Sequence, residues 1–238
     1  MEGYPLREKF PDVPVISTEE LNAAFESAVI VDVRSELEFD VVHITKAIHL
    51  PIAKLTFLEE LSEVVNPKNA HQVVFYCNGH TCAKSYEAVR IAKSNGFNRA
   101  FAYDAGIFDW IKKYPEKGEL LGETPVDHSL IIPEEEYQAR LVTFEKFKAL
   151  SKNSDSVVID IREPFQRSVV PEFPYSKNLY SGRLKRYIMA ETFKDRTLLF
   201  FDAVGRQVRW LHYYLKKYGY KNYFFLQDGI SSMPAHNS

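Results

Sequence analysis

The stretch Gln72–Asn95, QVVFYCNGHTCAKSYEAVRIAKSN, decides how the rest of the chain is interpreted. Its first part, Val73–Tyr76, is a short β-branched and aromatic run, which predicts a buried strand. Its last part, Ala83–Lys93, is rich in helix formers with apolar residues at helical spacing, and Asn95–Gly96 follows as a stop signal. The sequence therefore predicts a strand, a short loop and a helix.

The loop between them, Cys77–Cys82, is polar and has a cysteine at each end. Backbone N–H groups in such a loop, and the N-terminus of the helix behind it, stabilise negative charge. A thiol placed there is expected to have a lowered pKa and to be a good nucleophile. We therefore interpret this loop as a reactive site.

Composition sets limits on the class of protein. The chain has 238 residues, 45% hydrophobic and 26% charged, which is typical of a soluble globular protein. This length allows one large domain or two of about 100 residues. The net charge of −2 gives no sign of a nucleic-acid or membrane-surface partner, and no apolar run approaches the roughly 20 residues that span a bilayer.

The first residues and the cysteine usage bear on compartment. The start, MEGYPLREKFPD, lacks the apolar core of a signal peptide, so we expect a cytoplasmic protein, or a periplasmic one if a leader has been removed. The two cysteines lie five positions apart, whereas a structural disulfide framework has more cysteines at wider spacing.

Strand and helix patterns alternate along the first half, beginning with a capping-box helix start at Ser17–Glu20, and they begin again in the second half. Alternation of this kind predicts an α/β fold with a central, mainly parallel sheet flanked by helices on both faces. Ligands of such sheets bind beyond the carboxyl ends of the strands, where Cys77 is expected.

Three pairs of landmarks repeat at nearly constant spacing. Asp160 follows Asp32 by 128 residues, Asp202 follows Cys77 by 125, and Gly229 follows Gly106 by 123. This spacing predicts a duplicated domain. We expect a first domain over residues 1–118, a linker over 119–137 that is rich in charges and punctuated by prolines and glycines, and a second domain over 138–238.

The chain resembles the rhodanese-like sulfurtransferases in their tandem two-domain form. The features that carry the resemblance are Asp32-Val33-Arg34 with Glu38-Phe39, His43-Ile44, Ala47-Ile48-His49-Leu50-Pro51, the Cys77 loop, and Tyr103-Asp104-Ala105-Gly106 with Trp110. The resemblance covers nearly the whole chain, more strongly in the first half. It implies two rhodanese-like α/β domains.

The resemblance also implies a reaction. A Cys77 thiolate would take the outer sulfur of thiosulfate, a polysulfide or a persulfide, hold it as a persulfide, and pass it to a thiol or cyanide acceptor, without cofactor or metal. Asp32 and Arg34 are expected to tie neighbouring loops together. The expected surroundings of the substrate are Asn78, Gly79, His80, Thr81, Cys82, Lys84 and Ser85.

The loop departs from the family pattern at its far end, where Cys82 replaces a common arginine. We expect Lys84 and Ser85 to supply the missing charge and hydrogen bonds, and His80 to line the entrance; solvated surface positions are the alternative for Lys84 and His80. Cys82 either attacks the Cys77 persulfide, releasing sulfide and leaving a disulfide, or merely fills space.

Other reactive-cysteine classes fit less well. A phosphatase needs arginine six positions after the nucleophile, where this chain has Ala83. A thioredoxin motif needs two residues between its cysteines, and this loop has four. Cys77, His80 and Cys82 fall short of the four widely spaced ligands of a structural zinc site.

The second half has Asp202 where the first has Cys77, and a carboxylate cannot carry a persulfide. We expect the second domain to be catalytically inactive, with Arg206 and Arg209 on a solvated helix or facing an anionic partner. The alternative to an enzyme is a non-catalytic rhodanese-fold sulfur carrier, or a sensor whose Cys77/Cys82 pair reports redox or sulfide state.

Overall fold

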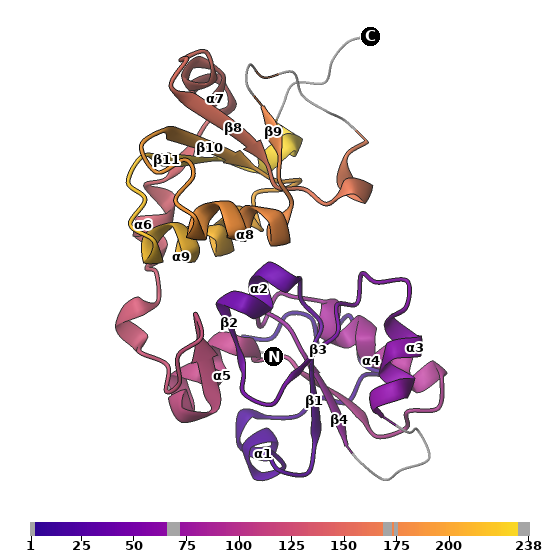
Figure 1. The fold of residues 1–238 in the computed structure, drawn as a ribbon. Helices are drawn as coiled ribbons and strands as arrows, with labels where there is room; N and C mark the ends of the chain where they lie inside the picture. Colours follow the sequence, from indigo (N-terminus) through magenta and orange to yellow (C-terminus); the bar gives the residue numbers. More distant parts are fainter. Residues whose placement is uncertain (1–2, 66–71, 169–172, 174–175, 233–238) are drawn as a thin grey trace. The chain divides into compact units, whose positions relative to one another are not determined.

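The computed structural model describes residues 3–65, 72–168, 173 and 176–232, and the chain divides into two compact units, residues 1–128 and 129–238 (Figure 1). The expected linker, 119–137, spans this division and holds secondary structure of its own. Strand β6 (Gly118–Leu120) pairs antiparallel with β2 (Val42–Ile44), so the chain remains part of the first unit up to that strand. Helix α6 (Glu134–Gln138) follows in the second unit.

The first unit is built on a parallel sheet with the order β3 (Ile48–His49), β1 (Val29–Asp32), β4 (Val73–Tyr76) and β5 (Ala100–Tyr103). Strand β4 has the predicted bounds. In its register, Asp32 lies opposite Tyr76 and Tyr76 opposite Tyr103. The carboxyl ends of three strands therefore meet at one edge, directly before Cys77.

Side chains of this sheet alternate between two covered faces, as the period of a strand requires. Val31 and Phe75 belong to the core packed under α3 (Phe57–Val64) and α4 (Lys84–Ser94). On the other face the ring of Tyr103 packs edge-on against the ring of Trp110 in α5 (Gly106–Lys113), with 6.0 Å between the ring centroids. The predicted α/β fold with helices on both faces is confirmed.

Two short helices of the first unit begin at serine caps. Ser17 starts α1 (Thr18–Ala23) and Ser35 starts α2 (Glu36–Val41), each in a capping box with a glutamate three residues on. The box predicted at Ser17 is confirmed. The second box matters for the site, because its glutamate is the buried Glu38.

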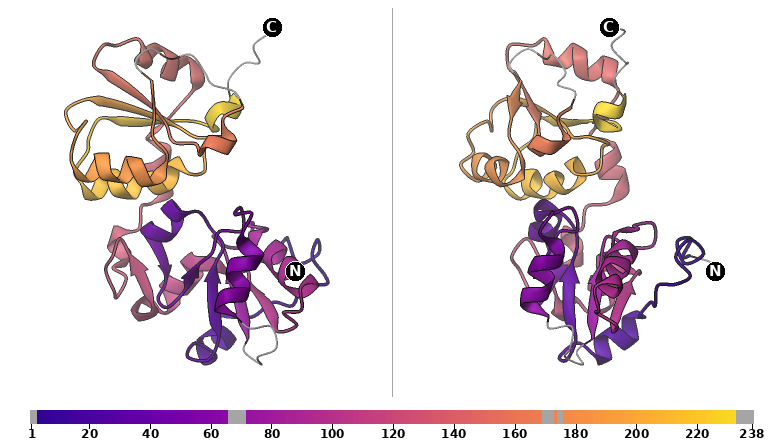
Figure 2. Two further views of the ribbon diagram at one scale, coloured as in Figure 1. Left: turned by 45° about the vertical axis from the view of Figure 1, so that its right-hand side comes forward. Right: turned by 90° about the vertical axis from the view of Figure 1, so that its right-hand side faces the viewer.

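The second unit has a five-stranded parallel sheet ordered β7 (Leu141–Val142), β11 (Tyr223–Leu226), β10 (Thr197–Phe201), β8 (Ser156–Asp160) and β9 (Lys177–Asn178). Helix α7 (Phe144–Ser151) covers one side of it, and α8 (Ser181–Met189) and α9 (Val208–Lys217) cover the other (Figures 1 and 2). The order β9-β8-β10-β11 is the same as the order β3-β1-β4-β5 of the first unit. No helix in the described ranges is long and apolar enough to cross a membrane.

Candidate functional site

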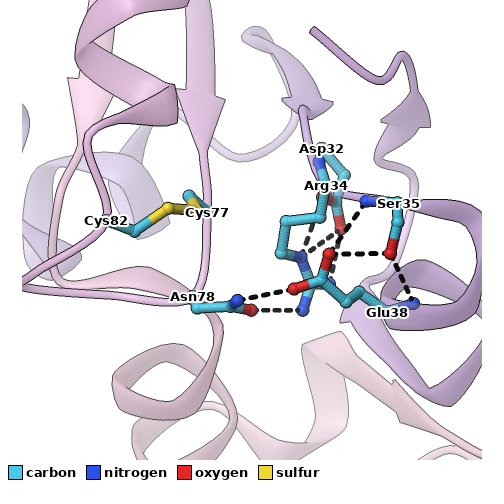
Figure 3. Close-up of a disulfide and its surroundings, with 7 residues drawn as sticks. All are labelled: Asp32, Arg34, Ser35, Glu38, Cys77, Asn78 and Cys82. Carbon is cyan, nitrogen blue, oxygen red and sulfur yellow. Dashed lines mark hydrogen bonds and ion pairs between the residues drawn. A yellow bond between two sulfur atoms is a disulfide. The ribbon is translucent and has the colours of Figure 1, made fainter. Parts of the chain in front are cut away.

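Cys77 follows β4 directly, and its sulfur is joined to that of Cys82 in a disulfide (Figure 3). The two Cα atoms are 6.3 Å apart, within the range that a disulfide bridges without moving the backbone. The sequence predicts a reactive Cys77 thiolate; the structure holds the oxidised pair instead. The tight loop permits this bond, since it brings both cysteines within bonding reach.

The two sulfurs differ in exposure. Cys77 is 1% exposed and belongs to the apolar core with Tyr86, Ala88 and Val89, whereas Cys82 is partly exposed and packs on the edge of that core. In the oxidised state, therefore, solvent reaches the pair mainly from the Cys82 side.

The loop passes close to the start of α5, and a glycine on each side permits this. Gly79 has φ +142° and Gly106 has φ +77°, values that favour glycine. A Cβ on Gly106 would overlap the backbone of Gly79. The Ile107 amide donates to the Cys77 carbonyl at 3.2 Å, and the Cys82 amide donates to the Gly79 carbonyl at 2.8 Å. Gly106 thus fixes where the loop runs.

A buried network holds the loop from the other side (Figure 3). Arg34 donates hydrogen bonds to the Asp32 carboxylate from two nitrogens, Nε to Oδ1 at 2.9 Å and Nη2 to Oδ2 at 2.6 Å. Both side chains are fully buried. Arg34 Nη1 donates to Asn78 Oδ1 at 3.1 Å, and Asn78 Nδ2 donates to Glu38 Oε1 at 2.6 Å. Asp32 and Arg34 therefore connect β1 and α2 to the loop through Asn78.

Glu38 is the member of this network that sequence analysis did not place in the site. Burial, the largest single influence, acts to raise its pKa. The positive charges of Arg34 and Lys84 and hydrogen bonds from Asn78 and Ser35 outweigh it, so the pKa of Glu38 is lowered to about 2. Glu38 is thus a carboxylate at neutral pH. The capping-box pattern from Ser35 to Glu38 was the available sequence signal.

His80 contacts the N-terminal segment. Its Nδ1 lies 2.7 Å from the Gly3 carbonyl, its Nε2 lies 2.9 Å from Asp109 Oδ2, and its ring stacks on Tyr4 at 4.3 Å. Both oxygens can only accept, so the contact suits the doubly protonated ring. The hydrogen bond to Asp109 accordingly raises the pKa of His80. Sequence analysis had not connected Gly3 or Asp109 with this histidine.

The first turn of α4 supplies two further predicted residues. Lys84 is partly exposed and, with Ile52, Ala53 and Glu87, lines an open pocket of about 570 Å³. No ion-pair partner of Lys84 occurs among the residues that the structure describes. Ser85 is 1% exposed, and within the same residues its hydroxyl has no hydrogen-bond partner. Thr81, by contrast, is exposed.

In the second unit, the loop that corresponds to the Cys77 loop follows β10, and the side chain of Asp202 occupies its centre. The buried carboxylate of Asp202 accepts hydrogen bonds from four amides, those of Val204 at 3.0 Å, Val208 at 3.1 Å, Gly205 and Gln207. This loop is therefore an amide cradle around the Asp202 side chain. Of the two expected arginines behind it, Arg209 pairs with Glu134 at 2.7 Å.

The described ranges contain no group of three or more His, Cys, Asp or Glu side chains that could hold a metal ion. The Cys77 loop and the Asp202 loop are thus defined by sulfur, carboxylate and amide groups.

Comparison with known proteins gives a family match within the first unit. Residues 17–113 match the family described as "Rhodanese-like domain". The match includes β1, the Cys77 loop and α5, the elements that build the site.

Particular relatives match over a similar length of the chain. The chain is 33% identical over 105 residues to the tRNA uridine(34) hydroxylases of several Escherichia coli strains, among them K12 / DH10B; the match covers 42% of this chain and 29% of the relative. The chain thus spans less than a third of the length of these relatives.

Solved structures show weaker likeness. A thiosulfate sulfurtransferase from Pseudomonas aeruginosa is 19% identical, with a TM-score of 0.42, covering 92% of this chain and 42% of that one. The human single-domain sulfurtransferase is 22% identical, with a TM-score of 0.37, covering 42% of this chain and 97% of that one.

Proposed function

We propose that the chain is a sulfurtransferase of the rhodanese type, which moves sulfane sulfur from thiosulfate, a polysulfide or a persulfide to a thiophilic acceptor through a Cys77 persulfide. The observation that carries this proposal is the position of Cys77 in a rhodanese-like domain, between the carboxyl end of β4 and the loop that leads into α4.

The reaction begins from the reduced pair. The Cys77 thiolate attacks the outer sulfur of thiosulfate, the S–S bond of the donor breaks, and sulfite leaves with the bonding electrons. The enzyme keeps the sulfur as Cys77–S–S⁻. A thiol or cyanide then attacks the outer sulfur and regenerates the thiolate. Covalent catalysis divides the transfer into two displacements, each with a good leaving group.

The Asp202 loop supports the idea that such loops stabilise an anion. Its four amides belong to residues two, three, five and six after Asp202. The residues with the same spacing after Cys77 are Gly79, His80, Cys82 and Ala83. The Cys82 amide donates to the Gly79 carbonyl, so the other three are the amides that we expect to face the thiolate or persulfide in the reduced loop, as those of the second unit face the carboxylate.

Lys84 and Ser85 complete the proposed site. Lys84, partly exposed at the start of α4, attracts the donor dianion, and the buried hydroxyl of Ser85, which has no hydrogen-bond partner among the described residues, donates to the sulfur anion. His80, in the middle of the loop and in contact with Gly3, Tyr4 and Asp109, is our candidate for the residue that steers the acceptor. The second unit transfers no sulfur, because its cradle already holds the Asp202 carboxylate. The match to the relatives named for tRNA covers 29% of their length, and the net charge of −2 gives no independent support for an RNA substrate.

The test is intact mass spectrometry of reduced, desalted protein after brief treatment with thiosulfate, together with thiocyanate formation in the presence of cyanide. We expect sulfite release and cyanide-dependent turnover, both lost in Cys77→Ser. Lys93→Ala, an exposed change on the helix that follows the loop, is the matched control and should keep both activities. Sulfite release by Cys77→Ser at the rate of the unmodified protein would refute the proposal.

The disulfide itself favours a second candidate, a sensor of redox or sulfide state. The sensor predicts stable oxidation of both thiols with negligible turnover of thiosulfate. Turnover with cyanide by the reduced protein therefore separates the two.

A further inference from the structure

The bond between Cys77 and Cys82 shows which two sulfur atoms the loop brings together. It joins Sγ to Sγ, so in the reduced protein the Cys82 sulfur lies beside the inner sulfur of any persulfide carried on Cys77. The sequence has no third cysteine. Any thiol that this chain supplies to its own persulfide is therefore that of Cys82.

We propose that Cys82 is a resolving cysteine and that the chain reduces sulfane sulfur to sulfide. This inference rests on the proposed function, because it needs the Cys77 persulfide. The Cys82 thiolate attacks Sγ of Cys77, the bond from that Sγ to the outer sulfur breaks, and hydrosulfide leaves with the electron pair. The sulfane sulfur is reduced by two electrons, and the two cysteine sulfurs are oxidised to the disulfide.

Proximity makes this internal route the favourable one. Cys77 and Cys82 belong to one short loop, so attack by Cys82 needs no encounter with a second molecule, whereas an external thiol must first bind. Cys82 requires no approach from solvent. Its Cα is 6.3 Å from that of Cys77, so the bridge closes within the geometry that the loop already has.

The difference in exposure also determines how the cycle closes. A dithiol, either a protein dithiol or dithiothreitol, attacks the sulfur of Cys82, the more exposed of the two cysteine residues, and Cys77 leaves as a thiolate. The second thiol of the reductant then displaces Cys82, giving an oxidised reductant and the reduced pair. Each turnover with thiosulfate thus consumes one dithiol and yields one sulfite and one sulfide.

The experiment is a single turnover. Protein is reduced, freed of reductant and mixed with one equivalent of thiosulfate, and sulfite, sulfide and intact mass are measured. We expect the unmodified protein to release one equivalent each of sulfite and sulfide and to become lighter by two hydrogen atoms. Cys82→Ser should release sulfite, release no sulfide and become heavier by one sulfur atom, and Cys77→Ser should do none of these.

The outcomes separate the two proposals. No sulfite from either the unmodified protein or Cys82→Ser means that the proposed function itself has failed. Sulfite without sulfide, with the extra sulfur retained on Cys77 of the unmodified protein, overturns the resolving role alone. An extra sulfur on Cys82, located by peptide fragmentation, also overturns it, because it means transfer of the outer sulfur. Cyanide-dependent thiocyanate formation by Cys82→Ser checks that this variant is folded.

Discussion

Replacing Glu38 with glutamine should weaken the first unit by an amount that depends on pH. Glu38 Oε1 accepts from Asn78 at 2.6 Å, and Oε2 accepts from the Ser35 amide at 3.0 Å and from its hydroxyl at 2.7 Å. Glutamine keeps the shape of the side chain but removes its negative charge. Its NH2 group replaces one of the two oxygens that accept these hydrogen bonds, and an NH2 group cannot accept from a donor. The variant therefore loses the pairing with Arg34 and at least one hydrogen bond.

The pKa of Glu38 gives the magnitude. Its decrease from 4.5 to about 2 corresponds to about 3 kcal/mol of folding free energy, at about 1.4 kcal/mol for each tenfold change in proton affinity. Because the pKa is lower in the folded state, this contribution is fully present above pH 4.5 and is lost as the pH falls towards 2. The unmodified protein and Glu38→Gln should therefore differ in free energy of unfolding by about 3 kcal/mol at neutral pH. At roughly one pH unit below the unfolded pKa of 4.5, this difference should be smaller by about 1.4 kcal/mol.

Urea unfolding followed by Trp110 fluorescence measures this gap in the first unit, in a Trp210→Phe background and without reductant. Glu36→Gln is the matched control, because Glu36 starts the same helix but is exposed, and it should change stability by less than about 0.5 kcal/mol. Equal stability of the Glu38 and Glu36 variants at neutral pH would refute the stabilising role of the network. A gap that stays constant with pH would refute the lowered pKa.

Three further predictions concern the two loops. Lys84→Ala should raise the KM for thiosulfate roughly fivefold, about 1 kcal/mol for one partly exposed charge, whereas the exposed Lys93→Ala on the same helix should leave it unchanged; steady-state kinetics decide. Asp202→Asn should destabilise the second unit by about 2–4 kcal/mol, because an amide oxygen serves only about two of the four N–H donors; hydrogen exchange of the second unit measures this loss, with exposed Asp228→Asn as control. Asp109→Asn should return the pKa of His80 towards 6.5 in an NMR titration, which exposed Glu116→Gln should not do. In the unmodified protein, the contact of His80 with Gly3 and Tyr4 should hold below pH 6.5 and weaken as the pH rises through the raised value.

Local patterns predicted the elements that build the site. The run Val73–Tyr76 is a strand with those same bounds, and the helix predicted over Ala83–Lys93 is Lys84–Ser94. Both depend on short-range physics: β-branched residues that fit a buried strand, and helix formers that end at Asn95. Asp32 and Arg34 are expected to tie neighbouring loops together, and in the structure Arg34 Nη1 donates to Asn78 Oδ1 in the Cys77 loop.

The contacts that sequence analysis missed are long-range. Asn78 meets Glu38 across 40 residues, His80 meets Asp109 across 29, and His80 meets Gly3 across 77. Each depends on where the ends of several strands meet, which the pattern of a single segment does not specify. The same holds for the disulfide: the spacing of Cys77 and Cys82 made a bridge possible, but only the course of the loop past Gly106 sets the Cα separation.

The second unit acts as an internal control for the first. Arg162 grips Asp160 with Nε at 2.9 Å and Nη2 at 2.8 Å, as Arg34 grips Asp32, and Gly229 leaves room for the Asp202 loop as Gly106 does for the Cys77 loop. With these supports kept in both units, the difference in chemistry comes down to the side chain that follows the strand. A carboxylate there saturates the amides permanently. The sulfur of Cys77, by contrast, carries a negative charge as a thiolate or persulfide and loses it in the disulfide. In the proposed reaction the charge in the first loop therefore changes during each cycle, whereas the Asp202 carboxylate of the second loop takes no part in such a change.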